Sequence, residues 1–279
     1  MARMSAPEPQ SLALPDGRLV RWFDTGGAAD ARVLFWHHGT PQTGAVIEPI
    51  ADAAAARGLR VVSCARPGYP GSDARPGRSV ADAAADVVAV LDHLGIGEVV
   101  TAGASGGGPH ALALAALAPE RVRAAVVLAG IAPYTASPDW FTGMADPSGL
   151  GAALGGRDDR LEHARTAEFD PDSFTSRDFE ALNADWGPLG ADAGAGAADG
   201  PDGEVDDDIA YVSPWGIDLA AVRCPVLLVQ GGADRVVPPG HAALQLERLP
   251  RGELWLRPRE GHVSVLTGLG VALDWALSR

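Results

Sequence analysis

The chain has 279 residues, a length typical of one domain with an insertion or of two small domains. Its 22 basic residues, all of them arginine, are outnumbered by 36 acidic ones, and the net charge of −14 argues against a nucleic-acid partner and against an anionic membrane surface. The sequence contains no lysine, which excludes Schiff-base, pyridoxal-phosphate, Ser-Lys and P-loop chemistry, because each needs a lysine amine.

Cysteine usage and the N-terminal segment narrow the class further. Neither Cys64 nor Cys224 belongs to a Cys-x-x-Cys pair, which excludes a four-cysteine zinc site and a disulfide scaffold. The first ten residues lack the apolar run of a signal peptide, and no apolar stretch approaches the ~20 residues of a membrane span. The sequence therefore predicts a cytoplasmic protein that needs no cofactor and no metal.

Short apolar runs alternate with helical patterns along most of the chain. Strands are expected at residues 11–14, 18–23, 32–36, 60–64, 99–102, 123–128, 225–230 and 253–256, and helices at 47–57, 80–94, 106–117, 241–249 and 263–277. This alternation is typical of an α/β protein, with a mainly parallel sheet and helices on both of its faces.

Residues 134–215 interrupt this alternation. They hold 18 acidic residues and four arginines, hence the entire net charge, and more than half of the chain's aromatic residues. We expect residues 1–133 and 216–279 to form the core domain, and 134–215 to form a cap over the carboxyl ends of the strands. Within the cap, residues 190–203 contain no apolar side chain larger than alanine, so we expect a mobile loop at 190–208.

A Gly-Ala-Ser-Gly-Gly sequence at 103–107 lies between an expected strand and an expected helix. Glycines on both sides of Ser105 leave room for a sharp turn that exposes its hydroxyl. The next amide, the N–H of Gly106, lies at a helix N-terminus, where negative charge is stabilised. Ser105 is thus a candidate nucleophile; the alternative is a glycine-rich turn with an inert serine.

A His-His-Gly-Thr-Pro loop at 37–41 follows an apolar strand. Such a loop can direct the Thr40 N–H toward the same point as the Gly106 N–H, and two such donors form an oxyanion hole. We expect His38 to hold this loop, with Gly39, by hydrogen bonding. A metal site at the two histidines is disfavoured, because neighbouring side chains that leave a strand point in opposite directions.

Two further candidates, Asp234 and His262, each follow an expected strand. The chain order Ser105, Asp234, His262 is that of hydrolases with a serine on a strand-to-helix turn. A turn aspartate and a lone surface histidine are the alternatives. Asp139, just after the sixth strand, is the competing candidate for the acid.

Together these motifs, with the Arg-Pro-Gly-Tyr-Pro-Gly-Ser turn at 66–72, resemble the α/β-hydrolase superfamily over nearly the whole chain outside the insertion. The resemblance implies an eight-stranded, mostly parallel sheet with a helical cap after strand six. It also implies Ser105 as nucleophile, His262 as base, Asp234 as orienting acid, and the amides of Thr40 and Gly106 as oxyanion hole.

The function expected is that of a serine hydrolase that cleaves a carboxylic ester, thioester or lactone through an acyl-enzyme. The acidic cap favours neutral or cationic small-molecule substrates. Serine at position 105, where dehalogenases and epoxide hydrolases carry aspartate, disfavours those reactions. The alternatives are a proline-iminopeptidase-like aminopeptidase, a cofactor-free perhydrolase, a C–C hydrolase and a non-catalytic ligand-binding protein.

Overall fold

The computed structural model describes residues 7–28 and 30–279. Residues 1–6 and 29 belong to the expected core domain but lie outside the described residues. Residues 1–6 are also part of the ten N-terminal residues that lack the apolar run of a signal peptide. Eight strands form one sheet in the order β1-β2-β4-β3-β5-β6-β7-β8. The strands are β1 (Gln10–Ala13), β2 (Leu19–Asp24), β3 (Val33–His37), β4 (Arg60–Cys64), β5 (Val99–Ala104), β6 (Val122–Leu128), β7 (Val226–Gly231) and β8 (Gly252–Arg257).

The sheet is mostly parallel. β1 pairs antiparallel with β2, and β2 pairs antiparallel with β4, whereas all the other pairings are parallel. Strands β3, β5 and β7 are buried along their whole length, as expected for parallel strands covered on both faces. Because parallel strands end at one edge, the residues that follow β3, β5, β7 and β8 emerge on the same side of the sheet.

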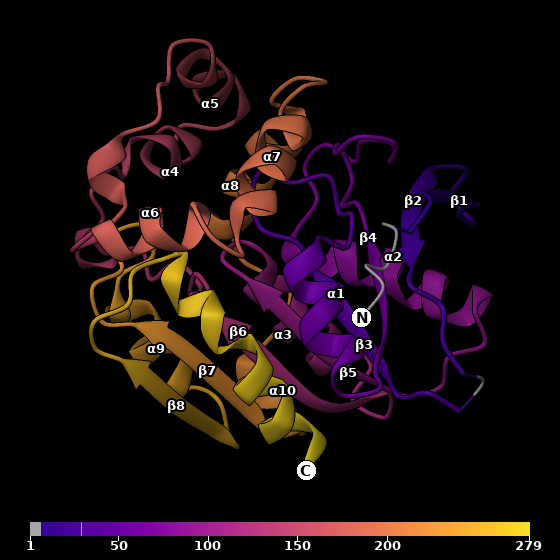
Figure 1. Ribbon diagram of the computed structural model, residues 1–279. Coiled ribbons are helices and arrows are strands. Elements are labelled where there is room, and N and C mark those ends of the chain that lie inside the picture. Colours follow the sequence, from indigo (N-terminus) through magenta and orange to yellow (C-terminus); the bar gives the residue numbers. More distant parts are fainter. Residues whose placement is uncertain (1–6, 29) are drawn as a thin grey trace.

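Two helical layers cover the sheet (Figure 1). One face carries α1 (Glu48–Ala55) and α10 (Leu269–Leu277), the latter preceded by a 3₁₀ turn, η4 (Ser264–Gly268). The other face carries α2 (Val80–His93), α3 (Gly107–Leu117) and α9 (Pro239–Leu246). The predicted α/β architecture and eight-stranded sheet are therefore confirmed, although the expected helix at 263–277 is a 3₁₀ turn followed by an α-helix.

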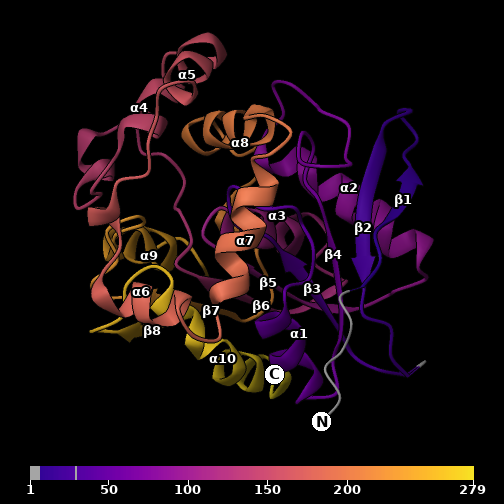
Figure 2. The same ribbon diagram turned by 45° about the horizontal axis from the view of Figure 1, so that its top comes forward.

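The segment between β6 and β7 is helical, as predicted, and it lies over the carboxyl edge of the sheet (Figures 1 and 2). Its elements are η1 (Pro138–Phe141), α4 (Ser148–Ala153), α5 (Arg157–Ala164), η2 (Pro171–Ser173), α6 (Ser176–Leu182), α7 (Gly187–Gly196) and α8 (Asp202–Val212), with η3 (Leu219–Ala221) leading back to β7. None of the helices in the described part of the chain combines the length and apolar character that crossing a membrane requires.

The prediction of a loop at 190–208 is wrong, because α7 and α8 occupy most of that stretch. Its small residues allow close backbone packing instead of flexibility: Gly196 packs on the backbone of Gln42, and Gly203 packs on the backbone of Gly68. The acidic residues at 206–208 are buried rather than solvated, and each forms an ion pair with an arginine.

Gly203→Ala tests this close packing. A β-carbon there would lie 2.8 Å from Cδ2 of Tyr69 and 2.9 Å from the carbonyl of Gly68, so we expect stability to fall by about 1–3 kcal/mol. Gly194→Ala in α7 is the matched control, because its β-carbon meets open space and should add about 0.5–1 kcal/mol through helix propensity. Urea denaturation measures the free energy of unfolding of both variants. If the two substitutions stabilise the protein equally, Gly203 is not closely packed.

Candidate active site

Ser105 lies on a tight turn between β5 and α3. Its φ of 53° is in the left-handed region, which costs a non-glycine residue on the order of 1–2 kcal/mol. The turn is held by the hydrogen bond from the Ser105 N–H to the Leu128 carbonyl, 2.9 Å long. Ser105 remains partly exposed, while its neighbours on both sides are buried. The strained conformation therefore presents the hydroxyl at the carboxyl edge of the sheet.

Two glycines make this turn sterically feasible. A β-carbon at Gly103 would overlap the backbone carbonyl of Gly107. A β-carbon at Gly107 would in turn overlap the carbonyls of His37 and His38 at the end of β3. The serine turn and the loop after β3 are thus in direct backbone contact, as the sequence predicts for an oxyanion hole built from both.

Asp234 and His262 meet at the ends of β7 and β8. Nδ1 of His262 lies 2.8 Å from Oδ2 of Asp234, whose Oδ1 accepts the N–H groups of Val236 and Val237, each at 2.9 Å. Burial lowers the pKa of His262, but the charge and hydrogen bond of Asp234 outweigh it, so that the pKa lies above its usual 6.5. The competing acid, Asp139, is exposed in η1.

Asp178 of α6 supports the histidine loop from the cap. One carboxylate oxygen accepts the N–H groups of Val263 and Ser264, both at 2.8 Å, directly after His262. The other accepts the N–H and hydroxyl of Thr175 in the capping box that begins α6. Asp178 is fully buried, and a β-carbon at Gly261 would overlap its carboxylate. The cap therefore fixes the turn that carries His262.

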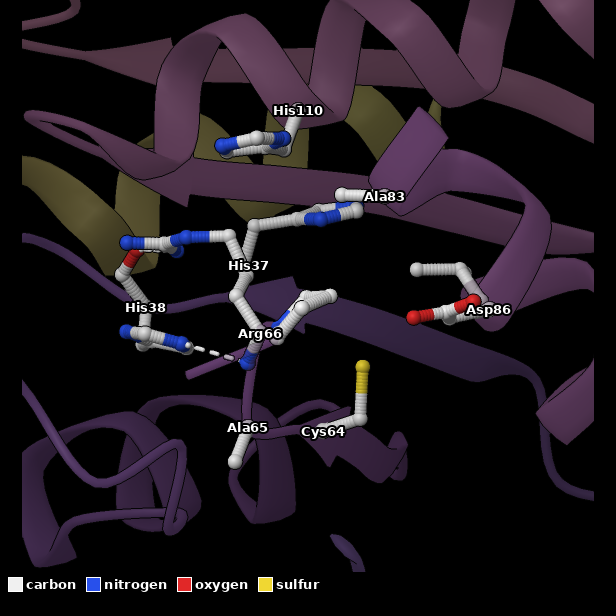
Figure 3. Close-up of a pocket in the computed structure, with 10 residues that line it drawn as sticks. His37, His38, Cys64, Ala65, Arg66, Ala83, Asp86 and His110 are labelled. Carbon is white, nitrogen blue, oxygen red and sulfur yellow. Dashed lines mark hydrogen bonds between the residues drawn. The ribbon is translucent and has the colours of Figure 1, made fainter. Parts of the chain in front are cut away.

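The loop after β3 is held by His38 and Arg66. His38 Nδ1 lies 2.7 Å from the Gly39 carbonyl, and its Nε2 accepts the backbone N–H of Arg66 at 3.1 Å, the dashed bond in Figure 3. Burial, and next the positive charge of Arg66, keep the pKa of His38 well below 6.5, so the ring is neutral. The Arg66 guanidinium also binds the carbonyls of His38 and Gly39.

Asp207 of α8 is the centre of a buried cluster behind that loop. Its carboxylate binds the guanidinium groups of Arg66 and Arg78, and it also accepts the hydroxyls of Tyr69 (2.7 Å) and Thr40 (2.8 Å). Burial acts to raise the pKa of Asp207, but the charges of the two arginines outweigh this effect, so the pKa lies well below 3.8. His110 Nε2 lies 3.6 Å away, and burial lowers the pKa of that ring to about 4.

Tyr211, one turn further along α8, connects the two proposed oxyanion residues. Its hydroxyl donates to the Gly106 carbonyl at 2.9 Å and lies 3.0 Å from Oγ1 of Thr40. A β-carbon at Gly106 would overlap Oγ1 of Thr40 and the hydroxyl oxygen of Tyr211, so Thr40 lies directly beside Gly106. The cap helix thus contacts the point where the sequence predicts the oxyanion hole.

Asp178, Asp207 and Tyr211 are not among the site residues predicted from the sequence. One signal for α8 was present: Gly203, Asp207 and Tyr211 recur every four residues, the spacing of one helix face. Asp178 carried only the capping-box spacing with Thr175, which predicts a helix start and not a contact with the histidine loop.

Comparisons with known proteins identify the family of the chain. A family model described as alpha/beta hydrolase fold matches residues 32–269, and the chain belongs to that family. It is 30% identical over 254 residues to the 2-hydroxy-6-oxononadienedioate/2-hydroxy-6-oxononatrienedioate hydrolase of Burkholderia vietnamiensis, covering 87% of this chain and 84% of that protein. It is 28% identical to the dihydrolipoyllysine-residue acetyltransferase component of the acetoin cleaving system of Pseudomonas putida, covering 92% of this chain but only 65% of that relative's length.

Solved structures share the fold at lower identity. A bromoperoxidase from Bacillus anthracis superposes with a TM-score of 0.76 at 21% identity, covering 98% of this chain and 100% of that one. A thermophilic esterase from Thermogutta terrifontis superposes with a TM-score of 0.71 at 20% identity, covering 97% and 98%. These likenesses establish the α/β-hydrolase fold.

Asp178→Asn should destabilise the protein in a pH-dependent way. Burial acts to raise the pKa of Asp178, but backbone N–H groups of Ser264 and Thr175 bind the ionised form and lower it below 3.8. The ionised carboxylate therefore contributes stability above that pH, which is lost as pH falls through the lowered pKa. We expect a loss of about 1–3 kcal/mol at neutral pH that shrinks below about pH 4.

Urea denaturation of wild type and variant from about pH 7 down to about pH 2.5, well below the ordinary carboxyl pKa of 3.8, measures this difference. Asp185→Asn, at an exposed position close by in the cap, is the control and should change little. A difference for Asp178→Asn that stays constant over the whole pH range would show that the carboxylate charge is not what holds the loop.

Proposed function

We propose that the protein is a serine hydrolase that cleaves a carboxylic ester, thioester or lactone through an acyl-enzyme on Ser105. The observation that supports this most strongly is the strained turn that holds Ser105 at the carboxyl edge of the sheet. The hydrogen-bonded pair of Asp234 and His262 lies at the same edge. The same three residues were proposed from the sequence alone.

In the proposed mechanism, the Ser105 oxygen attacks the acyl carbon while Nε2 of His262 takes the hydroxyl proton. Asp234 accepts the Nδ1–H, which fixes the tautomer and stabilises the imidazolium. The amides of Thr40 and Gly106 bind the oxyanion, and removal of one such donor costs about 3 kcal/mol in comparable sites. His262 then protonates the leaving group, and water hydrolyses the acyl-enzyme.

We propose that neutral or cationic acyl substrates are preferred. The support is the charge of the cap, whose 18 acidic residues exceed its arginines by 14. Part of that charge is neutralised, because acidic residues of α8 pair with Arg157 and Arg160 within the cap and with Arg66 and Arg78 of the core. The exposed remainder would repel anionic substrates, less so as salt rises.

A second candidate is a C–C hydrolase on the same three residues. The observation in its favour is the 30% identity to the Burkholderia vietnamiensis hydrolase, whose name describes a dicarboxylate substrate. A doubly charged anion is the substrate that an acidic cap favours least, and for this reason the ester reaction is placed first.

Fluorophosphonate labelling with peptide mapping tests the proposal. We expect the label on Ser105, and Ser105→Ala should remove both the label and hydrolysis while leaving the melting temperature nearly unchanged. A panel of esters, lactones, aminoacyl anilides and a 2-hydroxy-6-oxo-dienoic acid separates the activities. Turnover of the dienoic acid alone would replace the ester assignment by the C–C reaction, and label at another residue would reject Ser105.

The pH profile of kcat/KM tests the roles of His262 and Asp234. A general base must be neutral, so activity should fall as pH drops through the pKa of His262, with a midpoint above 6.5. Asp234→Asn removes the charge that raises this pKa while burial still lowers it, so the midpoint should move to lower pH and kcat should fall about 10³–10⁴-fold. Asp139→Asn, at the exposed competing position, should leave the midpoint and kcat unchanged. If Asp139→Asn changes them and Asp234→Asn does not, Asp139 is the acid.

A further inference from the structure

The peptide between Gly39 and Thr40 provides one donor of the proposed oxyanion hole, and its carbonyl is unusually well bound. The Gly39 carbonyl accepts Nη2 of Arg66 at 2.9 Å and lies 2.7 Å from Nδ1 of His38. Since a trans peptide is planar, its C=O and N–H point in opposite directions. Fixing the carbonyl toward Arg66 therefore fixes the direction of the Thr40 N–H.

A cation on the carbonyl also changes the strength of the donor. Hydrogen bonding to a carbonyl increases the polarisation of the amide, and chains of such bonds reinforce one another in a low-dielectric interior. Arg66 is only 4% exposed, so its charge acts through protein rather than through water. The Thr40 N–H is thus a better donor to a developing negative charge than an unassisted amide.

Arg66 is itself held by the cap. Oδ2 of Asp207, on α8, binds its Nη2 at 2.6 Å and its Nε at 3.0 Å. The same oxygen accepts the Thr40 hydroxyl at 2.8 Å, and that hydroxyl oxygen accepts Nη2 of Arg66 at 3.0 Å. Arginine, carboxylate and loop therefore form a closed set of hydrogen bonds that joins the cap to the oxyanion peptide.

Asp207 acts on Arg66 by holding it in place. Its carboxylate is fully buried between Arg66 and Arg78, and His110 beside it has its pKa lowered to about 4 by burial. Of these groups, Arg66 is the one whose guanidinium reaches the Gly39 carbonyl. A cation fixed on that carbonyl favours an anion at the N–H of the same peptide.

We propose that Arg66, clamped by Asp207 of the cap helix, is a positioning residue that orients and polarises the Gly39–Thr40 peptide toward the oxyanion. This inference rests on the proposed function. It makes α8 part of the catalytic apparatus, because the helix that covers the site also sets the strength of one of its donors.

The test compares inhibitors that do and do not form an oxyanion. A trifluoromethyl ketone forms one: the Ser105 oxygen bonds to its carbonyl carbon, the serine proton passes to His262, and the carbonyl oxygen becomes negative. The matching trifluoromethyl secondary alcohol cannot. In Asp207→Asn and in Arg66→Lys, we expect ketone affinity to fall about tenfold or more, alcohol affinity to change less than about twofold, and kcat to fall with KM nearly constant.

Arg160→Lys is the matched control. Arg160 has a similarly small exposed fraction, and its hydrogen bonds go to Asp208 and Glu204 of the same helix and not to the loop after β3. It should leave the ratio of ketone to alcohol affinity unchanged. An equal change of that ratio in Arg160→Lys would show that loosening of the cap in general is responsible, and an unchanged ratio in Asp207→Asn and Arg66→Lys would overturn the proposal.

If the two charge variants do not fold, Thr40→Val takes their place. It deletes the hydroxyl that Arg66 and Asp207 share without burying a new charge, and we expect the same selective loss of ketone affinity; an unchanged ratio overturns the proposal. Absence of both ester turnover and fluorophosphonate labelling in the wild type would instead refute the proposed function, and this inference with it.

Discussion

The buried carboxylate of Asp207 is the contact on which the cap and the core both depend. It binds Arg66 and Arg78 with almost no solvent exposure on any of the three side chains. Breaking such a buried pair by removing one partner costs about 3–5 kcal/mol, because the remaining charge is left without a counter-charge. α8 is therefore held on the core by this ion cluster as well as by buried side chains such as Tyr211 and Val212.

The site is assembled at one edge of the sheet because the strands are parallel. The residues that follow β3, β5, β7 and β8 lie on the same side, among them Ser105, Asp234 and His262, so distant parts of the chain converge without long loops. The cap then adds second contacts to the same turns, from Asp178 to the histidine loop and from Tyr211 to Gly106.

Most of the core could be predicted from the sequence, since apolar runs and glycine turns are local signals. Ser105, Asp234 and His262 each follow a strand, and the order of strands is enough to bring them to one edge. The stretch 190–208 was mistaken for a loop because its stabilising contacts are not local. Asp192 binds Gln42 and Thr43, and Asp207 binds residues far away in sequence, so no nearby pattern marks these acidic side chains as buried.

The cap is divided into an inner and an outer part. α8 contacts the loop after β3, Arg66 and Gly106, whereas α4 and α5 pack against each other and against α8, further from the sheet (Figure 2). The two parts are not independent, because Arg157 and Arg160 of α5 form ion pairs with Asp206 and Asp208 of α8. The face of α8 that carries Gly203, Asp207 and Tyr211 contacts the core directly, at Gly68, Arg66 and Gly106. We therefore expect substitutions in the outer helices to reach the loop after β3 through α8, and substitutions on that face of α8 to reach it directly.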